Sequence, residues 1–200
     1  MKTASLALLA VLAFVSVVAA ADQAPLIQNT RVRVWDVPPG AAAPTTDPTR
    51  DVVTFVIRGD RANVETAVLY RARNSVAPGA PADARRIVIE LQDATVPPLA
   101  NTSGYQLGFP RPGSLKLFEN ERVVVWSSTW TPGVGTPMHF HDKDVVVTFL
   151  ADGALTSIDP QGRSTTNERR FGDTSFNARD RTHIERLDRG QGRAMMVELK

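Results

Sequence analysis

Residues 133–153 read GVGTPMHFHDKDVVVTFLADG and contain two of the three histidines of the chain. His139 and His141 are two residues apart, and side chains at that spacing in a β-strand point to the same face of a sheet. The third histidine, His183, lies in THIERL at residues 182–187. An imidazole from a neighbouring strand would complete a facial set of three ligands, and neutral imidazole suits Zn, Cu, Fe and Ni.

Short apolar runs rich in Val, Ile, Thr and aromatic residues fill the rest of the chain, and helix signals are weak after residue 22. Fourteen Pro and thirteen Gly separate these runs. Strands are predicted at Val32–Trp35, Val52–Ile57, Ala67–Arg71, Ile87–Leu91, Leu115–Phe118, Val123–Ser128, Val145–Leu150, Ala154–Ile158, Asp173–Asn177, Thr182–Arg186 and Ala194–Leu199. Many short strands at this spacing indicate an all-β sandwich or barrel.

The chain contains an internal repeat whose matches keep their order. The matching stretches are NTRVRVW at 29–35 with NERVVVW at 120–126, DVVTF at 51–55 with DVVVTF at 144–149, and IEL at 89–91 with VEL at 197–199. We therefore expect an N-terminal half at residues 22–95, a Pro/Gly-rich connector at 96–113 and a C-terminal domain at 114–200. Chance similarity among Val-rich strands is the alternative interpretation.

The first 21 residues are typical of a secretory signal peptide. Lys2 precedes an apolar run at residues 4–18, and three alanines at 19–21 offer a cleavage site before Asp22. An uncleaved membrane anchor is the alternative, although the run is shorter than the ~20 residues of a spanning helix. The chain has no cysteine, so no disulfide staples the fold. We expect a bacterial protein that is periplasmic or secreted, with no membrane contact after cleavage.

The charges point away from a nucleic-acid partner. The chain has 23 basic and 21 acidic residues, with a formal net charge of +2, and they are interspersed rather than clustered. No Gly-rich phosphate loop opens a helix, and no serine has a histidine to spare for a Ser-His-Asp hydrolase. We expect a small-molecule ligand, and no nucleic acid, as the partner.

The stretch at 133–153, together with the segment from Gly172 to His183, resembles the two motifs of the cupin superfamily. The first motif has a Gly, H-x-H, an acidic residue and a closing Gly, and the second runs from a Gly through Pro-x-Gly to a His. The resemblance covers about residues 118–200 and extends to the first half only through the repeat. It implies a cupin-type double-stranded β-helix (jelly-roll) fold, as two tandem barrels. It also implies one divalent metal ion (Fe, Mn, Zn, Ni or Cu) bound by His139, His141 and His183.

The sequence departs from the cupin pattern at several positions. The usual motif Glu falls at Val145, which shares strand parity with the two histidines, and Asp144 should face outward unless a bulge re-aims it. Ala178 and Asp180 stand where Pro and Gly are usual. The N-terminal half has no histidine, so we expect either a degenerate copy kept for packing or a second, metal-free ligand pocket.

Three neutral ligands would leave a bound ion its full charge, which favours anionic ligands. We therefore expect an exported metal-binding cupin, as a metal-dependent enzyme (oxygenase, isomerase or lyase) acting on a small organic acid or diketone. A non-catalytic cupin that binds a small molecule or a metal is one alternative, and a structural protein with vestigial histidines is another. No residue is identified as a catalytic acid or base. Cupins often pair through sheet edges, so a homodimer is a further expectation.

Overall fold

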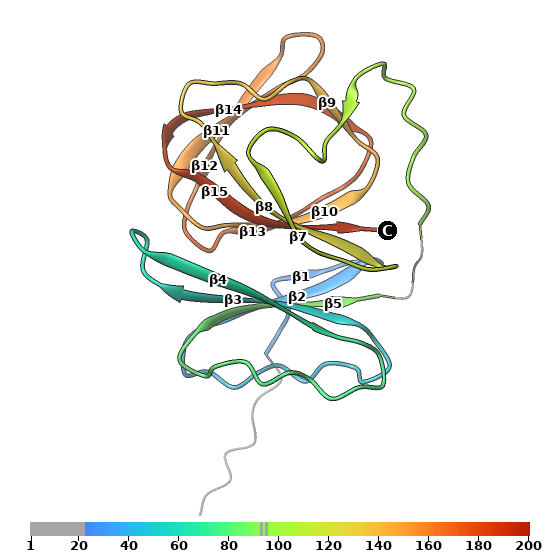
Figure 1. The fold of residues 1–200 in the computed structure, drawn as a ribbon, viewed down its shortest axis with the longest axis vertical. Helices are drawn as coiled ribbons and strands as arrows, with labels where there is room; N and C mark the ends of the chain where they lie inside the picture. The colour runs from blue at the N-terminus through green and yellow to red at the C-terminus, as the bar shows by residue number, and fades with distance from the viewer. Residues whose placement is uncertain (1–22, 93, 95) are drawn as a thin grey trace, which may run out of the picture.

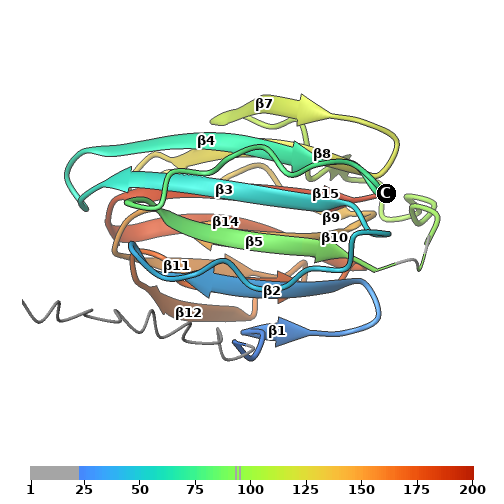
Figure 2. The ribbon, with the colours of Figure 1, turned by 90° about the horizontal axis from the view of Figure 1, so that it is seen from below.

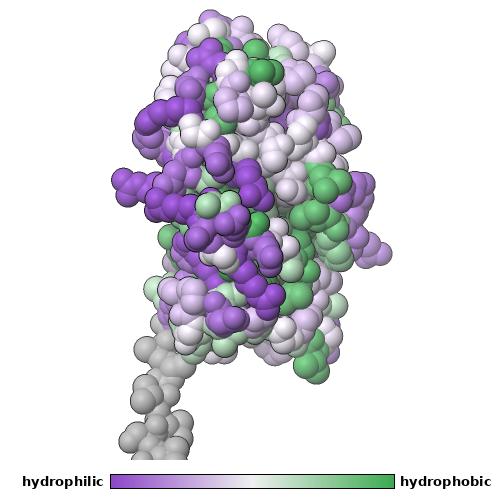
Figure 3. All heavy atoms as spheres, turned by 60° about the vertical axis from the view of Figure 1, so that its left-hand side comes forward, coloured by the Kyte–Doolittle hydropathy of each residue, from purple (hydrophilic) through white to green (hydrophobic). Residues whose placement is uncertain are grey.

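Every regular element in the described part of the chain is a β-strand, which confirms the all-β prediction. The computed structural model describes residues 23–92, 94 and 96–200, so the predicted signal peptide at residues 1–21 lies outside the described residues. The strands form three five-stranded sheets. Within the described ranges, no helix is long and apolar enough to span a bilayer. Hydrophilic side chains cover much of the face seen in Figure 3.

The N-terminal half contributes one antiparallel sheet. Its strands, in spatial order, are β1 (Ile27–Gln28), β2 (Val32–Val37), β5 (Arg85–Leu91), β3 (Val52–Gly59) and β4 (Val64–Arg71).

The C-terminal half contributes two sheets that face each other across a barrel interior (Figure 1). The first contains, in spatial order, β13 (Thr174–Asn177), β10 (Asp144–Phe149), β15 (Gly192–Leu199), β8 (Val123–Trp130) and β7 (Ser114–Glu119). The second contains β12 (Ser164–Arg169), β11 (Gly153–Ile158), β14 (Arg181–Gly190), β9 (His139–His141) and β6 (Gln106–Leu107). All pairings in these two sheets are antiparallel except that of β6 with β9.

The N-terminal sheet stacks on the outer face of the first barrel sheet, so the molecule has three sheet layers (Figures 1 and 2). The alternation of apolar residues along β10 shows how one strand serves two cores. Val146 belongs to the core between the N-terminal sheet and the barrel. Val145 and Val147 belong to the core inside the barrel, together with Trp126 and Trp130.

The sequence repeat corresponds to a repeat of strand pairing. In the N-terminal half β5 lies between β2 and β3, and in the C-terminal half β15 lies between β8 and β10. The registers match position by position: the pairs Val32–Leu91, Val53–Ile89 and Val53–Tyr70 correspond to Val123–Leu199, Val146–Val197 and Val146–Phe176. Each residue of one half can therefore be assigned an equivalent in the other.

Ion pairs across the interface obey the same correspondence. Arg31 Nη1 lies 3.6 Å from Asp144 Oδ2, and the equivalent Arg122 Nη1 lies 3.4 Å from Asp51 Oδ2. Both aspartates are buried. Each half therefore supplies an arginine to the aspartate of the other half, as two subunits of a symmetric dimer would.

A second closed barrel is not confirmed. The outer face of the N-terminal sheet is covered by coil at residues 38–51 and 72–84 rather than by a second sheet. These segments contain several prolines, which lack the N–H that a central strand needs. The expected connector at 96–113 contributes β6 to the barrel, and Phe109 packs in the barrel core.

Candidate metal centre

Two neighbouring strands bring the three histidines together. His139 and His141 lie on β9, which pairs antiparallel with β14, and His183 of β14 is the direct cross-strand partner of His139. Directly opposed residues have Cβ atoms about 5 Å apart on the same face of a sheet. The H-x-H spacing and this register are therefore sufficient to place all three side chains on the inner face.

The three imidazole rings form a nearly equilateral group. Their centroids are 5.0 Å, 4.8 Å and 5.1 Å apart, and one ring nitrogen of each lies within 4.8 Å of the other two. His139, His141 and His183 are 0%, 5% and 7% exposed. The arrangement is thus a buried set of nitrogen donors from residues far apart in the sequence.

Burial keeps the three imidazoles neutral. It is the largest cause that lowers the pKa of His139 and of His141, the latter well below its usual value, and it lowers the pKa of His183 to about 4. The nearby guanidinium groups of Arg111 and Arg181 lower these pKa values further, because they repel a second positive charge. Neutral imidazole is the form that donates a lone pair to a metal ion.

Hydrogen bonds orient two of the three rings, those of His139 and His183. His139 Nδ1 donates to the carbonyl oxygen of Pro137 at 2.8 Å, so its lone pair is on Nε2. His183 Nδ1 lies 3.0 Å from Ser157 Oγ, which leaves Nε2 toward the centre. These contacts to the second ring nitrogen are the kind that orient metal-ligating histidines.

The spacing of the nitrogens fits a shared ion. His141 Nε2 and His183 Nε2 are 3.2 Å apart. Two nitrogens bound about 2.1 Å from one ion at tetrahedral or octahedral angles lie roughly 3.0–3.4 Å apart. Two neutral imidazole nitrogens at this separation need either a proton or a cation between them. The donor set therefore fits a divalent ion.

Gly108, which directly follows β6, makes room for these rings. A Cβ atom at this position would lie 2.9 Å from both Cε1 and Nδ1 of His141, and 3.4 Å from Cδ2 of His139. Its backbone N–H donates to the carbonyl oxygen of Phe140 at 2.8 Å, which holds the glycine against β9. Gly108 lies in the expected connector, where the sequence offers no motif that marks it.

An ion pair between buried Arg111 and partly buried Glu185, which the sequence did not reveal, lies beside the histidines. Arg111 donates through Nη2 to Glu185 Oε2 at 2.6 Å and through Nη1 to His139 Nε2 at 2.8 Å. Trp130 Nε1 also donates to Glu185 Oε2, at 3.1 Å. Burial alone would raise the pKa of Glu185, but the positive charge of Arg111 is the largest of the causes that outweigh burial and lower it to about 2. Glu185 stands two residues after His183 and so shares its face; that parity was the available signal.

A cavity of about 280 Å³ opens inside the barrel next to His183 and Glu185. Two arginines, Arg169 and Arg181, line it, together with the side chains of Asn167, Asn177, Ser157 and Thr165. Arg169 Nε is buried without a hydrogen-bond partner among the described residues. The cavity therefore presents cations and neutral polar groups.

The atypical motif positions behave as follows. Val145 is buried inside the barrel, and Asp144 points to the N-terminal sheet, as strand parity predicts. Asp180 has φ +67°, the left-handed conformation that the usual Gly would adopt, and its N–H donates to the carbonyl oxygen of His141. Aspartate is among the residues that tolerate this conformation. The turn that leads into β14 therefore keeps its geometry without the glycine.

Comparison with known proteins gives a likeness at the level of solved structures. No protein-family model and no curated protein matches the chain. A cupin domain from Bordetella pertussis Tohama I is 28% identical in sequence, and the match covers 46% of this chain and 99% of that domain, with a TM-score of 0.39. A cupin 2 conserved barrel protein from Leptotrichia buccalis is 14% identical over 88% of this chain and 87% of its own, with a TM-score of 0.47. The protein Ylba from E. coli is 12% identical over 84% of this chain and 75% of its own, with a TM-score of 0.49.

All three TM-scores lie below 0.5, so the chain's own architecture has to define its fold. That architecture consists of two facing five-stranded sheets, in which every pairing except that of β6 with β9 is antiparallel. It carries an H-x-H strand paired with the strand of the third histidine, and a left-handed turn in place of the glycine of the second motif. These features match the cupin-type barrel fold that the sequence motifs predict.

Proposed function

We propose that this protein is an exported cupin that binds one divalent metal ion through His139, His141 and His183 and a small anionic chelating molecule beside it. The single observation that carries the proposal is the convergence of three buried, neutral imidazoles on one point, with two nitrogens 3.2 Å apart. The class of ligand comes from the cavity next to them.

The charges around the cavity favour an anion. Arg169 and Arg181 line it, and Arg169 Nε has no partner among the described residues. Glu185 is the acidic side chain in the lining, and Arg111 already neutralises it at 2.6 Å. A carboxylate or enolate that enters the cavity would therefore meet uncompensated positive charge.

The protein groups would position the ligand and hold the imidazoles. The Pro137 carbonyl fixes the tautomer of His139, and Ser157 contacts the second ring nitrogen of His183. The polar side chains of Asn167 and Asn177 offer hydrogen bonds within the cavity. A bound divalent ion would supply Lewis acidity toward an anionic oxygen of the ligand. An oxygenase, isomerase or lyase acting on a small organic acid or diketone is the enzyme class that this combination favours.

Arg111 favours a second candidate function, a metal-free barrel that binds the anion through its arginines alone. Its Nη1 donates to the lone pair of His139 Nε2, so metal binding by His139 requires this contact to be replaced. Arg111 also packs over Phe109, 4.8 Å from the ring centroid, and pairs with Glu185. Metal stoichiometry separates the two functions.

The test is a titration of chelator-treated protein with Fe(II), Mn(II), Zn(II), Ni(II) and Cu(II), followed by oxalate or acetylacetone. We expect one equivalent of at least one ion, and tighter binding of the anionic chelator when the ion is present. His141→Ala should abolish ion uptake. Thr182→Ala, which changes a neighbour of His183 on the opposite face of β14, should leave ion uptake unchanged. An equal stoichiometry in wild type and His141→Ala would contradict the proposal, and anion binding without any ion would favour the metal-free barrel.

Export is the part of the proposal that rests on residues 1–21 alone. Their basic start, apolar run and alanine site are typical of a signal peptide. Expression of the full chain in a bacterium, followed by fractionation and mass spectrometry, tests it. We expect a periplasmic or secreted product that begins near Asp22; an intact cytoplasmic or membrane-bound chain would contradict export.

A further inference from the structure

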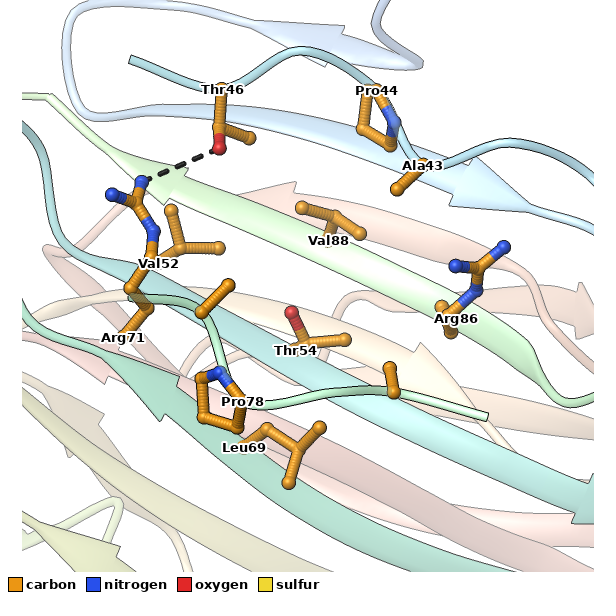
Figure 4. Close-up of a pocket in the computed structure, with 12 residues that line it drawn as sticks. Ala43, Pro44, Thr46, Val52, Thr54, Leu69, Arg71, Pro78, Arg86 and Val88 are labelled. Carbon is orange, nitrogen blue, oxygen red and sulfur yellow. Dashed lines mark hydrogen bonds between the residues drawn. The ribbon is translucent and has the colours of Figure 1, made fainter. Parts of the chain in front are cut away.

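A second pocket, of about 310 Å³, lies in the N-terminal half between its sheet and the covering coil. The sheet supplies Val52, Thr54, Leu69 and Val88, and the coil supplies alanines and prolines such as Pro44 and Pro78. Figure 4 shows the apolar side chains between two arginines at opposite ends, Arg71 and Arg86. The lining contains no histidine, aspartate or glutamate among the described residues.

This pocket occupies the position that corresponds to the barrel interior. By the matched registers, Thr54 is equivalent to Val147 and Val88 to Met196, both of which lie in the barrel core. Arg86 is equivalent to Ala194, a fully buried barrel residue. The N-terminal sheet thus has a face equivalent to the inner face of the barrel sheet, and this face carries the cation Arg86.

Arg86 is a buried cation that has no counterion among the described residues. It is 7% exposed, and Nη2 donates to the carbonyl oxygen of Ala41. Its Nε is buried and has no hydrogen-bond partner among residues 23–92, 94 and 96–200. No carboxylate of these residues lies within ion-pair distance of the guanidinium. A buried guanidinium in this state is costly unless an anion accompanies it.

Arg71 is better satisfied and is therefore not the anchor. It is also 7% exposed, and its guanidinium donates to the carbonyl oxygens of Pro48 and Asp47 and to Thr46 Oγ1. The buried N–H group without a hydrogen-bond partner is thus at the Arg86 end of the pocket. An apolar wall runs from there across Val88 and Leu69.

We propose that this pocket binds a small amphipathic carboxylate, with the carboxylate on Arg86 and the apolar body against Val88, Thr54 and Leu69. A pocket with an apolar wall and one well-placed charged group is the usual form of a site for such a ligand. Because none of the described lining residues is a histidine, aspartate or glutamate, the binding is independent of the three-histidine centre. It would give the N-terminal half a ligand function of its own.

The experiment is calorimetric titration of the protein with octanoate, and with octan-1-ol as a neutral probe of the same chain length. It is performed with a metal chelator present, on wild type and on His141→Ala, so that the barrel centre does not contribute. We expect octanoate to bind both proteins equally and more tightly than octan-1-ol by about tenfold or more, since a charge-assisted hydrogen bond is lost in the alcohol.

Two variants, Arg86→Gln and Ala80→Trp, locate the site, and a third, Arg58→Gln, serves as a matched control. Arg86→Gln should weaken octanoate about tenfold or more, whereas Arg58→Gln, an exposed position of β3 in the same sheet, should not. Ala80→Trp, which fills the pocket from the coil, should block binding even if Arg86→Gln does not fold. The proposal is overturned by the absence of octanoate binding to wild type, by equal affinities for octanoate and octan-1-ol, or by unchanged affinity in Ala80→Trp.

Discussion

Replacing Gly108 with alanine would test how tightly the histidine group is held. The added Cβ would lie 2.9 Å from Nδ1 and Cε1 of His141, a distance that real Cβ atoms essentially never show. The φ angle of Gly108 is not in the left-handed region, so alanine imposes no backbone strain of its own. The substitution therefore acts mainly by displacing the imidazole.

The size of the effect follows from the tolerance of metal bonds. Relief of a 2.9 Å contact to an ordinary 3.4 Å or more requires His141 to move by several tenths of an ångström. Bond lengths in a metal site vary by only about 0.2 Å. Loss of support for a ligand typically costs about 10- to 100-fold in metal affinity, or about 1.4–2.8 kcal/mol. We expect a loss in this range.

The assay is competition between the protein and a metal-chelating dye, with the free energy of unfolding measured in urea for each variant. Gly79→Ala is the matched control, because a Cβ at that position meets nothing within 4 Å. It should keep wild-type affinity. Wild-type affinity in a folded Gly108→Ala protein would refute the reasoning, since the imidazole would then bind an ion from a displaced position.

Three further predictions concern stability in urea. Burial lowers the pKa of His183 to about 4, so the unfolded chain binds a proton at this histidine at a higher pH than the native chain does. The free energy of unfolding of metal-free protein should therefore fall by about 2 kcal/mol between pH 7 and pH 5 because of this group. A stability that does not change with pH would contradict this. Asp180→Gly should raise stability by up to about 1 kcal/mol by relieving the left-handed turn, and a loss would show that the aspartate side chain supports the turn. Asp51→Asn, which weakens the ion pairs of buried Asp51 with Arg73 and Arg122, should cost about 1–3 kcal/mol, with wild-type stability as the contrary result.

The strands were predictable because their signal is local. All eleven predicted runs fall on strands, two of them with one extra residue, Leu150 and Asp173. The alternation of apolar residues in segments such as β3 and β10 reflects burial on one or both faces. Strand β12 was missed because STTNER at 164–169 lies at a sheet edge, is mostly exposed and needs no apolar residues. The two-residue strands β1 and β6 are too short to leave a pattern.

The failure of the second barrel to close was less visible. The repeat correctly relates β2, β5 and β3 to β8, β15 and β10, but it does not extend to a second sheet. The prolines of residues 38–51 and 72–84 were the signal that these segments could not pair as central strands. The homodimer stays a prediction; because the N-terminal sheet covers the outer face of the first barrel sheet, a second copy would need a different surface.

The histidines could be placed from spacing and motif, whereas the ion pair of Arg111 with Glu185 beside them could not. His139 and His141 share a face by parity, and His183 follows the second motif. Arg111 and Glu185 form their pair at 2.6 Å only because β6 and its following segment return to β9. Such a long-range contact leaves no local signature in a single sequence.

Elemental analysis of the native protein, isolated without a histidine tag, tests the metal centre most directly. The account predicts one equivalent of a divalent transition metal per chain in wild type and none in His141→Ala. A wild-type protein that carries no ion, and takes up none when Fe(II), Mn(II), Zn(II), Ni(II) or Cu(II) is added, would contradict it.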